Sequence, residues 1–196
     1  MELLTDRRLI AFSLCYFMFY LACYCPLNFL PDAMVREHGI SNTKAGHVIT
    51  FLGAGCMLGS ISAGLATNHF KNCAVLHSVG CMIVMGCCNI GMAFSDLYWQ
   101  FVVCSFIYGI AFRYMLVLHP IALVDMFGIN SLKVSFGIGM ACSCIGSLAG
   151  PPIVGWFKVL QGTYQLSFIV AGCCFFLAGI MASIALWKPN TKSSSS

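Results

Sequence analysis

Residues 134–157 read VSFGIGMACSCIGSLAGPPIVGWF and contain no Asp, Glu, Lys or Arg. One helical crossing of a bilayer needs about 20 predominantly apolar residues, so this stretch is long enough to span a membrane once. A surface helix of a soluble protein would carry charged residues along its solvent face. The stretch therefore predicts a transmembrane helix.

The composition of the whole chain fits a protein that lies mostly in lipid. Of its 196 residues, 60% are hydrophobic and 8% are charged, whereas a soluble domain has roughly a quarter charged residues. The basic residues are scattered and form no patch for nucleic acid. This balance excludes an ordinary cytosolic enzyme, a disordered chain and a nucleic-acid-binding module. At about 20 residues per span, the length allows roughly six spans.

Uncharged runs recur along the whole chain. They are 9–31, 45–70, 72–95, 97–124 with one interrupting arginine, 134–157 and 159–187. Backbone groups in lipid must be satisfied inside the segment, so these runs predict helices. We predict an all-α membrane protein with a six-helix bundle over 9–187 and spans at about 9–31, 45–69, 72–94, 98–124, 134–157 and 163–187. Residues 1–8 would be a short N-terminal segment, and residues 188–196 a disordered tail.

The basic residues between the spans predict the orientation of the bundle. One set of loops and ends holds Arg7, Arg8, Lys71, Lys133, Lys188 and Lys192, and the opposite set holds Arg36, Lys44 and Lys158. Cytoplasmic loops carry the excess of Lys and Arg, so both termini are expected in the cytoplasm. We expect a multi-pass protein of the plasma membrane.

Cysteine content and motifs point away from a metal centre and from catalysis. The chain has 13 cysteines, but no C-x-x-C occurs and most lie in apolar runs, where Cys behaves as a small hydrophobe. No nucleophile-and-base motif such as G-x-S-x-G or H-E-x-x-H is present. We therefore expect no enzyme activity, no metal and no cofactor.

Small residues predict which helices pack closely. Gly55 and Gly59 are four residues apart in the second span, and Gly146 and Gly150 are four apart in the fifth. This spacing lets two helix backbones approach each other. Pro151-Pro152 should bend or break the fifth helix, because neither residue can donate a backbone hydrogen bond.

Two parts of the chain also resemble each other. Gly59-Ser60 is followed by Phe70-Lys71, and Gly146-Ser147 is followed by Phe157-Lys158 at the same separation. Two units of three helices would explain this match, and an odd number of helices per unit would place them in opposite orientations. Chance matches of Gly and Lys explain these residues equally well at this point.

Three segments resemble one family of membrane proteins. Residues 123–128 (LVDMFG), 135–137 (SFG) and 150–156 (GPPIVGW) are similar to the fourth-to-fifth helix region in the C-terminal half of monocarboxylate transporters. That family belongs to the major facilitator superfamily. Leu30-Pro31 and the segment 37–41 (EHGIS) are similar to the outer loop of the same half. The resemblance covers residues 8–187.

The resemblance implies half of a major facilitator fold, built as a three-plus-three inverted repeat. Family members have twelve helices, and this chain resembles the last six. The implied function is transport of small organic anions of the monocarboxylate class, with or without a coupled proton, by alternating access. The motif positions with an implied structural or gating role are Gly59, Gly64, Asn68, Asp125, Gly128, Gly150, Pro151, Pro152 and Gly155.

A single six-helix half has only one wall of the substrate path. We therefore expect a second half, supplied by another chain or by a homodimer, or an ancillary membrane chaperone as partner. The alternative function is that of a truncated, non-transporting membrane protein that binds or regulates full-length carriers.

The chain departs from the family at a functional place. Proton-coupled lactate carriers of the family have an Asp and an Arg one turn apart on the second helix of this half. The matching positions here are Cys56 and Ser60. An Arg binds a carboxylate and an Asp carries a proton, and Cys and Ser do neither well. Proton-coupled transport by the usual pair is therefore in doubt.

The candidate substrate-binding residues are Arg113, His119 and Tyr20. Arg113 sits in mid-span, where it would bind an anion or, equally, pair with a group in the missing half or snorkel; Gly109 should leave room beside it. His119 is either a proton carrier or a neutral histidine in a helix interface, and the second role is favoured. Tyr20 either packs in the core or lines the anion pocket.

Overall fold

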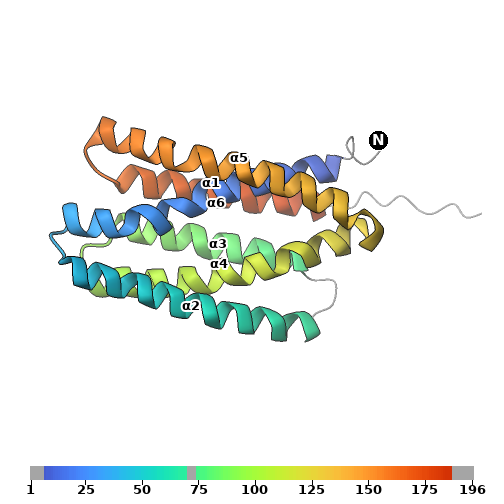
Figure 1. Ribbon diagram of the computed structural model, residues 1–196, viewed down its shortest axis with the longest axis horizontal. Coiled ribbons are helices and arrows are strands. Elements are labelled where there is room, and N and C mark those ends of the chain that lie inside the picture. Colours follow the sequence, from blue (N-terminus) through green and yellow to red (C-terminus); the bar gives the residue numbers. More distant parts are fainter. Residues whose placement is uncertain (1–6, 70–73, 187–196) are drawn as a thin grey trace, which may run out of the picture.

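The computed structural model describes residues 7–69 and 74–186, and nearly all of these are helical. The helices are α1 (Arg7–Arg36), α2 (Asn42–His69), α3 (Ala74–Ala93), α4 (Tyr98–Phe127), α5 (Leu132–Gln161) and α6 (Gln165–Leu186), and the 3₁₀ turn η2 (Ile129–Ser131) joins α4 to α5 (Figure 1). All six helices are long and apolar enough to cross a membrane, which confirms the predicted fold class. The predicted tail, and most of the predicted N-terminal segment, lie outside the described residues.

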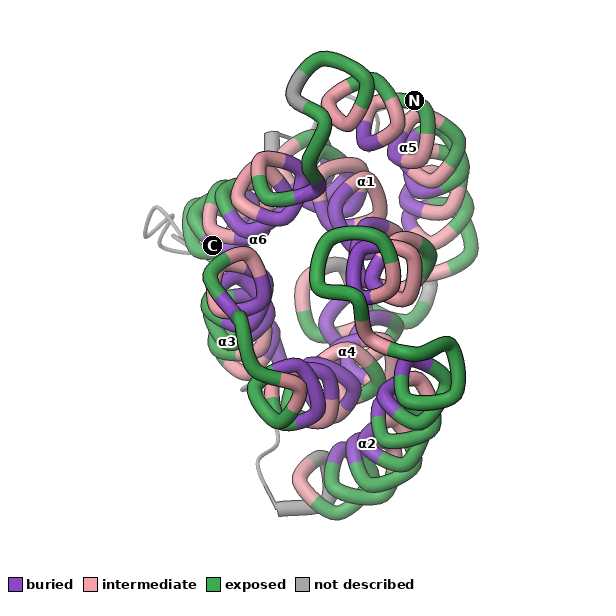
Figure 2. The backbone as a smooth tube through the Cα atoms, turned by 90° about the vertical axis from the view of Figure 1, so that its left-hand side faces the viewer, coloured by how far each residue is buried: buried purple, intermediate pink, exposed green. Residues whose placement is uncertain are grey.

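The six helices are arranged as two interlocked units of three. Helix α1 packs mainly against α5 and α6, α4 packs mainly against α2 and α3, and α3 packs against α6. Exchanging the first three helices with the last three leaves this pattern unchanged. Figure 2 shows α1 and α4 between two outer pairs, α2 with α5 and α3 with α6. The predicted three-plus-three inverted repeat is therefore confirmed, because each unit has an odd number of helices.

Glycines bring the helices of the two units into backbone contact. A Cβ on Gly146 or Gly150 of α5 would lie 2.6 or 2.7 Å from the carbonyl oxygens of Phe17 and Leu21 in α1. A Cβ on Gly55 or Gly59 of α2 would meet the carbonyl oxygens of Phe106 and Ile110 in α4 in the same way. Both pairs of carbonyls are four residues apart, like the glycines that face them. The prediction that the second and fifth spans pack closely is confirmed.

The proline pair does not break α5. The helix continues from Leu132 to Gln161 with Pro151 and Pro152 inside it, and α1 continues in the same way through Pro26 and Pro31. Prolines are tolerated in membrane helices because neighbouring helices and polar side chains satisfy the backbone groups that they free.

Aromatic side chains fill the space between the two central helices. Phe19 of α1 stacks on Phe112 of α4 with ring centroids 6.3 Å apart, and both belong to a cluster that includes Phe175 of α6. Tyr108 of α4 is fully buried, and its hydroxyl donates a hydrogen bond to the Cys23 carbonyl of α1 over 3.2 Å. These contacts hold α1 and α4 together at the centre of the bundle.

Candidate functional site

Arg113 lies in the middle of α4, and its side chain reaches the neighbouring helix α2. Its Nε donates a hydrogen bond to the Ser60 hydroxyl over 3.3 Å. That hydroxyl donates in turn to the Cys56 carbonyl within α2, 3.0 Å away. The guanidinium is therefore held where α2 and α4 meet, in the middle of the span.

Glycines explain why a side chain of α4 reaches α2 here. A Cβ on Gly59 would collide with the Ile110 carbonyl oxygen, and a Cβ on Gly109 would collide with the Leu52 carbonyl oxygen. We expected Gly109 to leave room for the guanidinium. In the structure it leaves room for the backbone of α2 instead, which brings Ser60 within reach of Arg113.

The contact between Arg113 and Ser60 bears on the positions where this chain departs from the family pattern. The resemblance implies an arginine at position 60 and an aspartate at position 56, where this chain has Ser60 and Cys56. Arg113 brings a guanidinium to position 60 from the facing helix. The arrangement restores the positive charge of the implied pair but supplies no carboxylate at position 56.

The guanidinium retains most of its capacity to bind a ligand. An arginine has five N–H donors, and the bond to Ser60 uses one of them. Within 7–69 and 74–186, both ion pairs are made by Asp32, and Arg113 takes part in neither. A guanidinium binds a carboxylate through two parallel N–H donors. The site can therefore accept an anion without breaking an existing ion pair.

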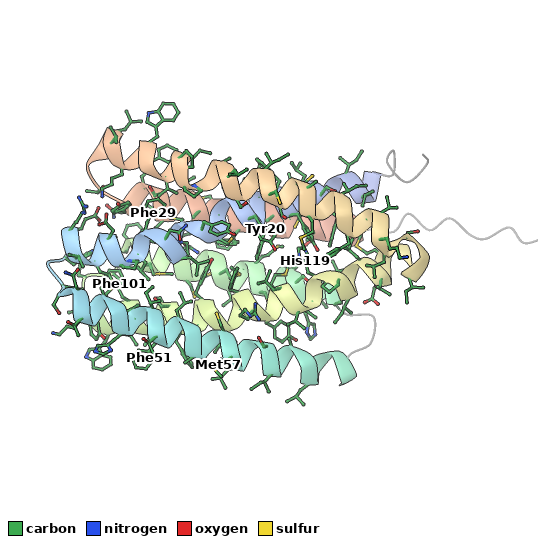
Figure 3. The ribbon with its side chains drawn as sticks, in the orientation of Figure 1. Tyr20, Phe29, Phe51, Met57, Phe101 and His119 are labelled. Carbon is green, nitrogen blue, oxygen red and sulfur yellow. The ribbon has the colours of Figure 1, made fainter. Side chains whose placement is uncertain are left out.

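Tyr20 and His119 lie close together in the middle of the bundle (Figure 3). Their ring centroids are 6.4 Å apart, with Tyr20 on α1 half-buried and His119 on α4 only 2% exposed. His119 stacks on Tyr16. It follows Arg113 by six residues, so the two side chains lie about 9 Å apart along α4 and on different faces of the helix. The structure therefore brings Tyr20 to His119 and places Arg113 at a separate point of α4.

The family-motif positions fall into three groups. Gly150 contacts the backbone of α1, as Gly59 contacts that of α4. Gly128 ends α4 with φ 76°, a left-handed conformation that favours glycine, and its N–H donates to the Val124 carbonyl over 2.9 Å.

The other motif positions lie elsewhere in α2, α4 and α5. A Cβ on Gly64 or Gly155 would meet no atom within 4 Å. Asp125 is exposed near the end of α4, and Pro151 and Pro152 lie inside α5. The side chain of Asn68 lies outside the described residues. The roles of these positions stay predictions.

The sequence did not predict one polar cluster, which is centred on Asp32. Asp32 at the end of α1 accepts hydrogen bonds from Lys158 Nζ (2.8 Å) and from the Tyr164 hydroxyl, while the Tyr164 N–H donates to Glu37. Burial raises the pKa of the Tyr164 phenol, and its bond to Asp32 acts in the same direction. The cluster joins the end of α1 to the turn between α5 and α6. Lys158 and Asp32 are 126 residues apart, so their pairing has no local signal in the sequence.

Comparison with known proteins places this architecture in a family. The family model described as Major Facilitator Superfamily matches residues 12–196. Monocarboxylate transporter 9 of Pongo abelii is 29% identical over 172 residues, which are 85% of this chain and 33% of that protein. Monocarboxylate transporter 1 of Rattus norvegicus is 22% identical over 188 residues, which are 95% of this chain and 38% of that protein.

The chain spans between 33% and 38% of the length of these curated relatives. The match nevertheless runs through nearly all of this chain, and it coincides with the six apolar helices and their inverted repeat. The family that the sequence motifs predicted is thereby confirmed. The chain belongs to the major facilitator superfamily, and monocarboxylate transporters are among its relatives.

Proposed function

We propose that this chain forms one half of a carrier for small organic anions of the monocarboxylate class, in which Arg113 binds the substrate carboxylate. The hydrogen bond from Arg113 to Ser60 carries the proposal. It puts a guanidinium at the α2 position where the resemblance implies the arginine of the family. The relationship to monocarboxylate transporters supports the same substrate class.

The energetics of Arg113 favour a ligand over a purely structural role. An arginine at the centre of a bilayer costs at least about 2.5–3.5 kcal/mol unless it faces a polar partner. A serine hydroxyl is a weak partner for a full charge, and the described carboxylates lie near or beyond the ends of the helices.

The proposed carrier needs a second six-helix half for alternating access. Helices α2 and α5 bury a smaller share of their residues than the other four helices do. Their exposed residues are mostly apolar, with Phe51 and Met57 on α2 and Leu148 and Trp156 on α5 as large examples. A second half packed along α2 and α5 would supply the other wall of a path beside Arg113, and substrate would cross by rocking of the two halves.

Recognition of the carboxylate group tests this function directly. Binding of a labelled monocarboxylate is measured in vesicles that hold this chain together with the N-terminal half of a monocarboxylate transporter. Unlabelled acid should compete, whereas the corresponding amide, which lacks the charge, should not. Arg113→Gln should remove this discrimination, and Arg113→Lys should weaken binding because an ammonium lacks the planar pair of donors.

Exchanging the arginine and the serine between positions 113 and 60 tests whether the place of the guanidinium matters more than the helix that carries it. Ser60→Arg combined with Arg113→Ser moves the group back to α2, and should recover part of the acid-selective binding that Arg113→Ser alone loses. Acid-selective binding that survives Arg113→Gln unchanged would contradict the proposed site.

A further inference from the structure

The described carboxylates of the bundle lie far from Arg113 along the helices. They belong to Asp32, Glu37, Asp96 and Asp125. Asp125 lies on the same helix as Arg113, twelve positions further on, which is about 18 Å along the axis. Asp96 precedes the first residue of α4 and is farther away still. Neither of these two carboxylates can therefore pair with the guanidinium.

The other two carboxylates are engaged at the C-terminal end of α1. Asp32 forms an ion pair with Lys158 over 2.8 Å, and the Tyr164 N–H donates a hydrogen bond to Glu37. Within the described part of the chain, Arg113 is thus a mid-span charge that no carboxylate balances.

Neutral groups orient Arg113 in the absence of an acid. Its Nε donates to the Ser60 hydroxyl, which donates in turn to the Cys56 carbonyl. A hydroxyl accepts such a bond without taking up a proton, and the Cys56 thiol is of a type that is uncharged at neutral pH. The empty site therefore carries a full positive charge, because a guanidinium stays protonated.

The imidazoles beside this part of α4 cannot serve as counter-ions. The Nδ1 of His77 on α3 lies 2.7 Å from the Tyr114 hydroxyl, and His119 stacks on Tyr16 of α1. Both contacts involve faces of α4 other than the one that meets α2. An imidazole is either neutral or positive, so a proton on either histidine would add to the charge of Arg113 and would not balance it.

We propose that the substrate carboxylate itself is the counter-ion of Arg113, and that the carrier moves the ionised acid without a proton. This inference rests on the proposed function of Arg113. A bound carboxylate cancels the charge of the guanidinium, so the occupied site is neutral and the empty site is positive. Each transport cycle then moves one negative charge across the membrane and no proton.

A carboxylate contributed by the second half would change this balance. It would pair with Arg113 in the empty carrier, and a proton would have to neutralise it before the substrate could bind. Such a cycle would carry one proton with each substrate and no net charge. The two charge balances therefore predict opposite responses to pH and to membrane potential.

Counting protons during binding tests the charge balance without transport. Binding of a monocarboxylate to this chain together with the N-terminal half of a monocarboxylate transporter is measured by calorimetry in nanodiscs, in two buffers with different heats of ionisation. A carboxylic acid with a pKa of about 4 is ionised throughout the range of about pH 6 to 8. We expect no proton uptake and the same affinity across this range. Uptake of one proton per substrate, with affinity falling as the pH rises, would overturn the proposal.

An acid introduced beside Arg113 should create the proton coupling that the site lacks. Cys56 lies one turn before Ser60, where α2 meets α4, and a Cβ on Gly109 would be 3.2 Å from the Cys56 nitrogen. The carboxylate of Cys56→Asp should pair with Arg113, so that binding takes up about one proton per substrate. Cys56→Asn has the same shape as Cys56→Asp without the charge, and it should bind substrate with no proton uptake. Equal proton counts in the two variants would contradict the proposed charge balance.

Membrane potential tests whether charge crosses with the substrate. In vesicles containing both halves, valinomycin and a potassium gradient set the potential while the pH is equal on both sides. Flux that remains in Arg113→Gln is subtracted, since the protonated acid can cross lipid by itself. An interior-positive potential of about 60 mV should accumulate the labelled anion about tenfold, because one charge moves through it. Accumulation that follows a pH gradient and ignores the potential would overturn the proposal.

Exchange at zero potential separates this proposal from the proposed function. Exchange of labelled anion inside for unlabelled anion outside moves neither net charge nor protons, so it should proceed under both charge balances and be lost in Arg113→Gln. Absence of that exchange would refute the proposed function and, with it, the role of the substrate as counter-ion. Exchange combined with proton-driven accumulation would refute the counter-ion role alone.

Discussion

Ser60 is the residue through which two helices meet at the candidate site. Its hydroxyl accepts from Arg113 and donates to the Cys56 carbonyl, so it fixes the direction of the guanidinium. Ser60→Ala removes the acceptor but leaves Arg113 in place. We expect substrate affinity to fall about 2- to 12-fold, the equivalent of one hydrogen bond of about 0.5–1.5 kcal/mol. Competition binding in vesicles that contain the second half measures the change.

Ser62→Ala is the control for this substitution. Ser62 lies two residues away on the same helix and bonds to the Gly59 carbonyl of α2 over 3.0 Å. Ser62→Ala therefore removes an equivalent hydroxyl, but not the one that bonds to Arg113. Equal losses of affinity in Ser60→Ala and Ser62→Ala would show that the hydroxyl of Ser60 does not position the guanidinium.

The sequence could identify Arg113 but not its partner. A single arginine in a long uncharged run is conspicuous because of its cost in lipid. Its contact with Ser60 crosses 53 residues and depends on which helices are neighbours and how closely they approach. Residue types were thus enough to predict the candidate substrate-binding residues, whereas their contacts depend on how the helices pack.

At the scale of helices, contacts between glycines and carbonyls hold α2 to α4 and α5 to α1. Gly59→Ala would force a methyl group against the Ile110 carbonyl oxygen, which is backbone and cannot rotate away. Overpacking of this kind costs about 1–3 kcal/mol. We expect thermal unfolding of the chain in nanodiscs to shift to lower temperature.

Gly53→Ala provides the matched control in the same helix. A Cβ at Gly53 would meet no atom within 4 Å, so the substitution should be neutral, or stabilise the helix by up to about 1 kcal/mol. A comparable loss of stability in Gly53→Ala would mean that the cost arises from adding a methyl group to this helix in general, for example through its lipid contacts. In that case the contact between α2 and α4 would not be the cause.

The Asp32 cluster fastens the end of α1 to α5 and to the turn before α6. Asp32→Asn keeps the shape of the side chain but removes the charge that Lys158 and Arg36 share. The carboxylate is partly buried, with 35% of its side chain exposed, so we expect a loss of about 1–2 kcal/mol of stability. Chemical or thermal unfolding in nanodiscs would detect it.

Asp96→Asn is the corresponding control, because Asp96 is exposed just before α4. Its effect should stay within about 0.5 kcal/mol. If both substitutions destabilise the protein equally, the effect comes from removing a surface charge and not from the cluster.

The existence of the helices was predictable because lipid allows few backbone structures. A long uncharged run has to be helical, so the pattern of charges was enough to find six helices. The proline pair showed the limit of local rules. Pro151 and Pro152 remove two backbone donors, yet α5 continues past them, because in a packed bundle other groups can satisfy the freed carbonyls.

At the scale of the whole molecule, the six helices differ in how much of their surface is buried inside the bundle. The central helices α1 and α4 hold the core, while α2 and α5 each pack tightly through one glycine-lined face and expose most of the rest. The inverted repeat relates these two outer helices to each other. Both therefore lie beside the central pair on the same side of the bundle (Figure 2), which is the side that a second half would cover.

The central claim is that this six-helix half works as a monocarboxylate carrier only with a second half and with Arg113. The most direct measurement is uptake of a labelled monocarboxylate into vesicles containing this chain alone, or this chain with the N-terminal half of a monocarboxylate transporter. We predict uptake only when both halves are present, and a loss of at least tenfold in Arg113→Ala. No uptake with both halves, or uptake that Arg113→Ala leaves unchanged, would contradict the account.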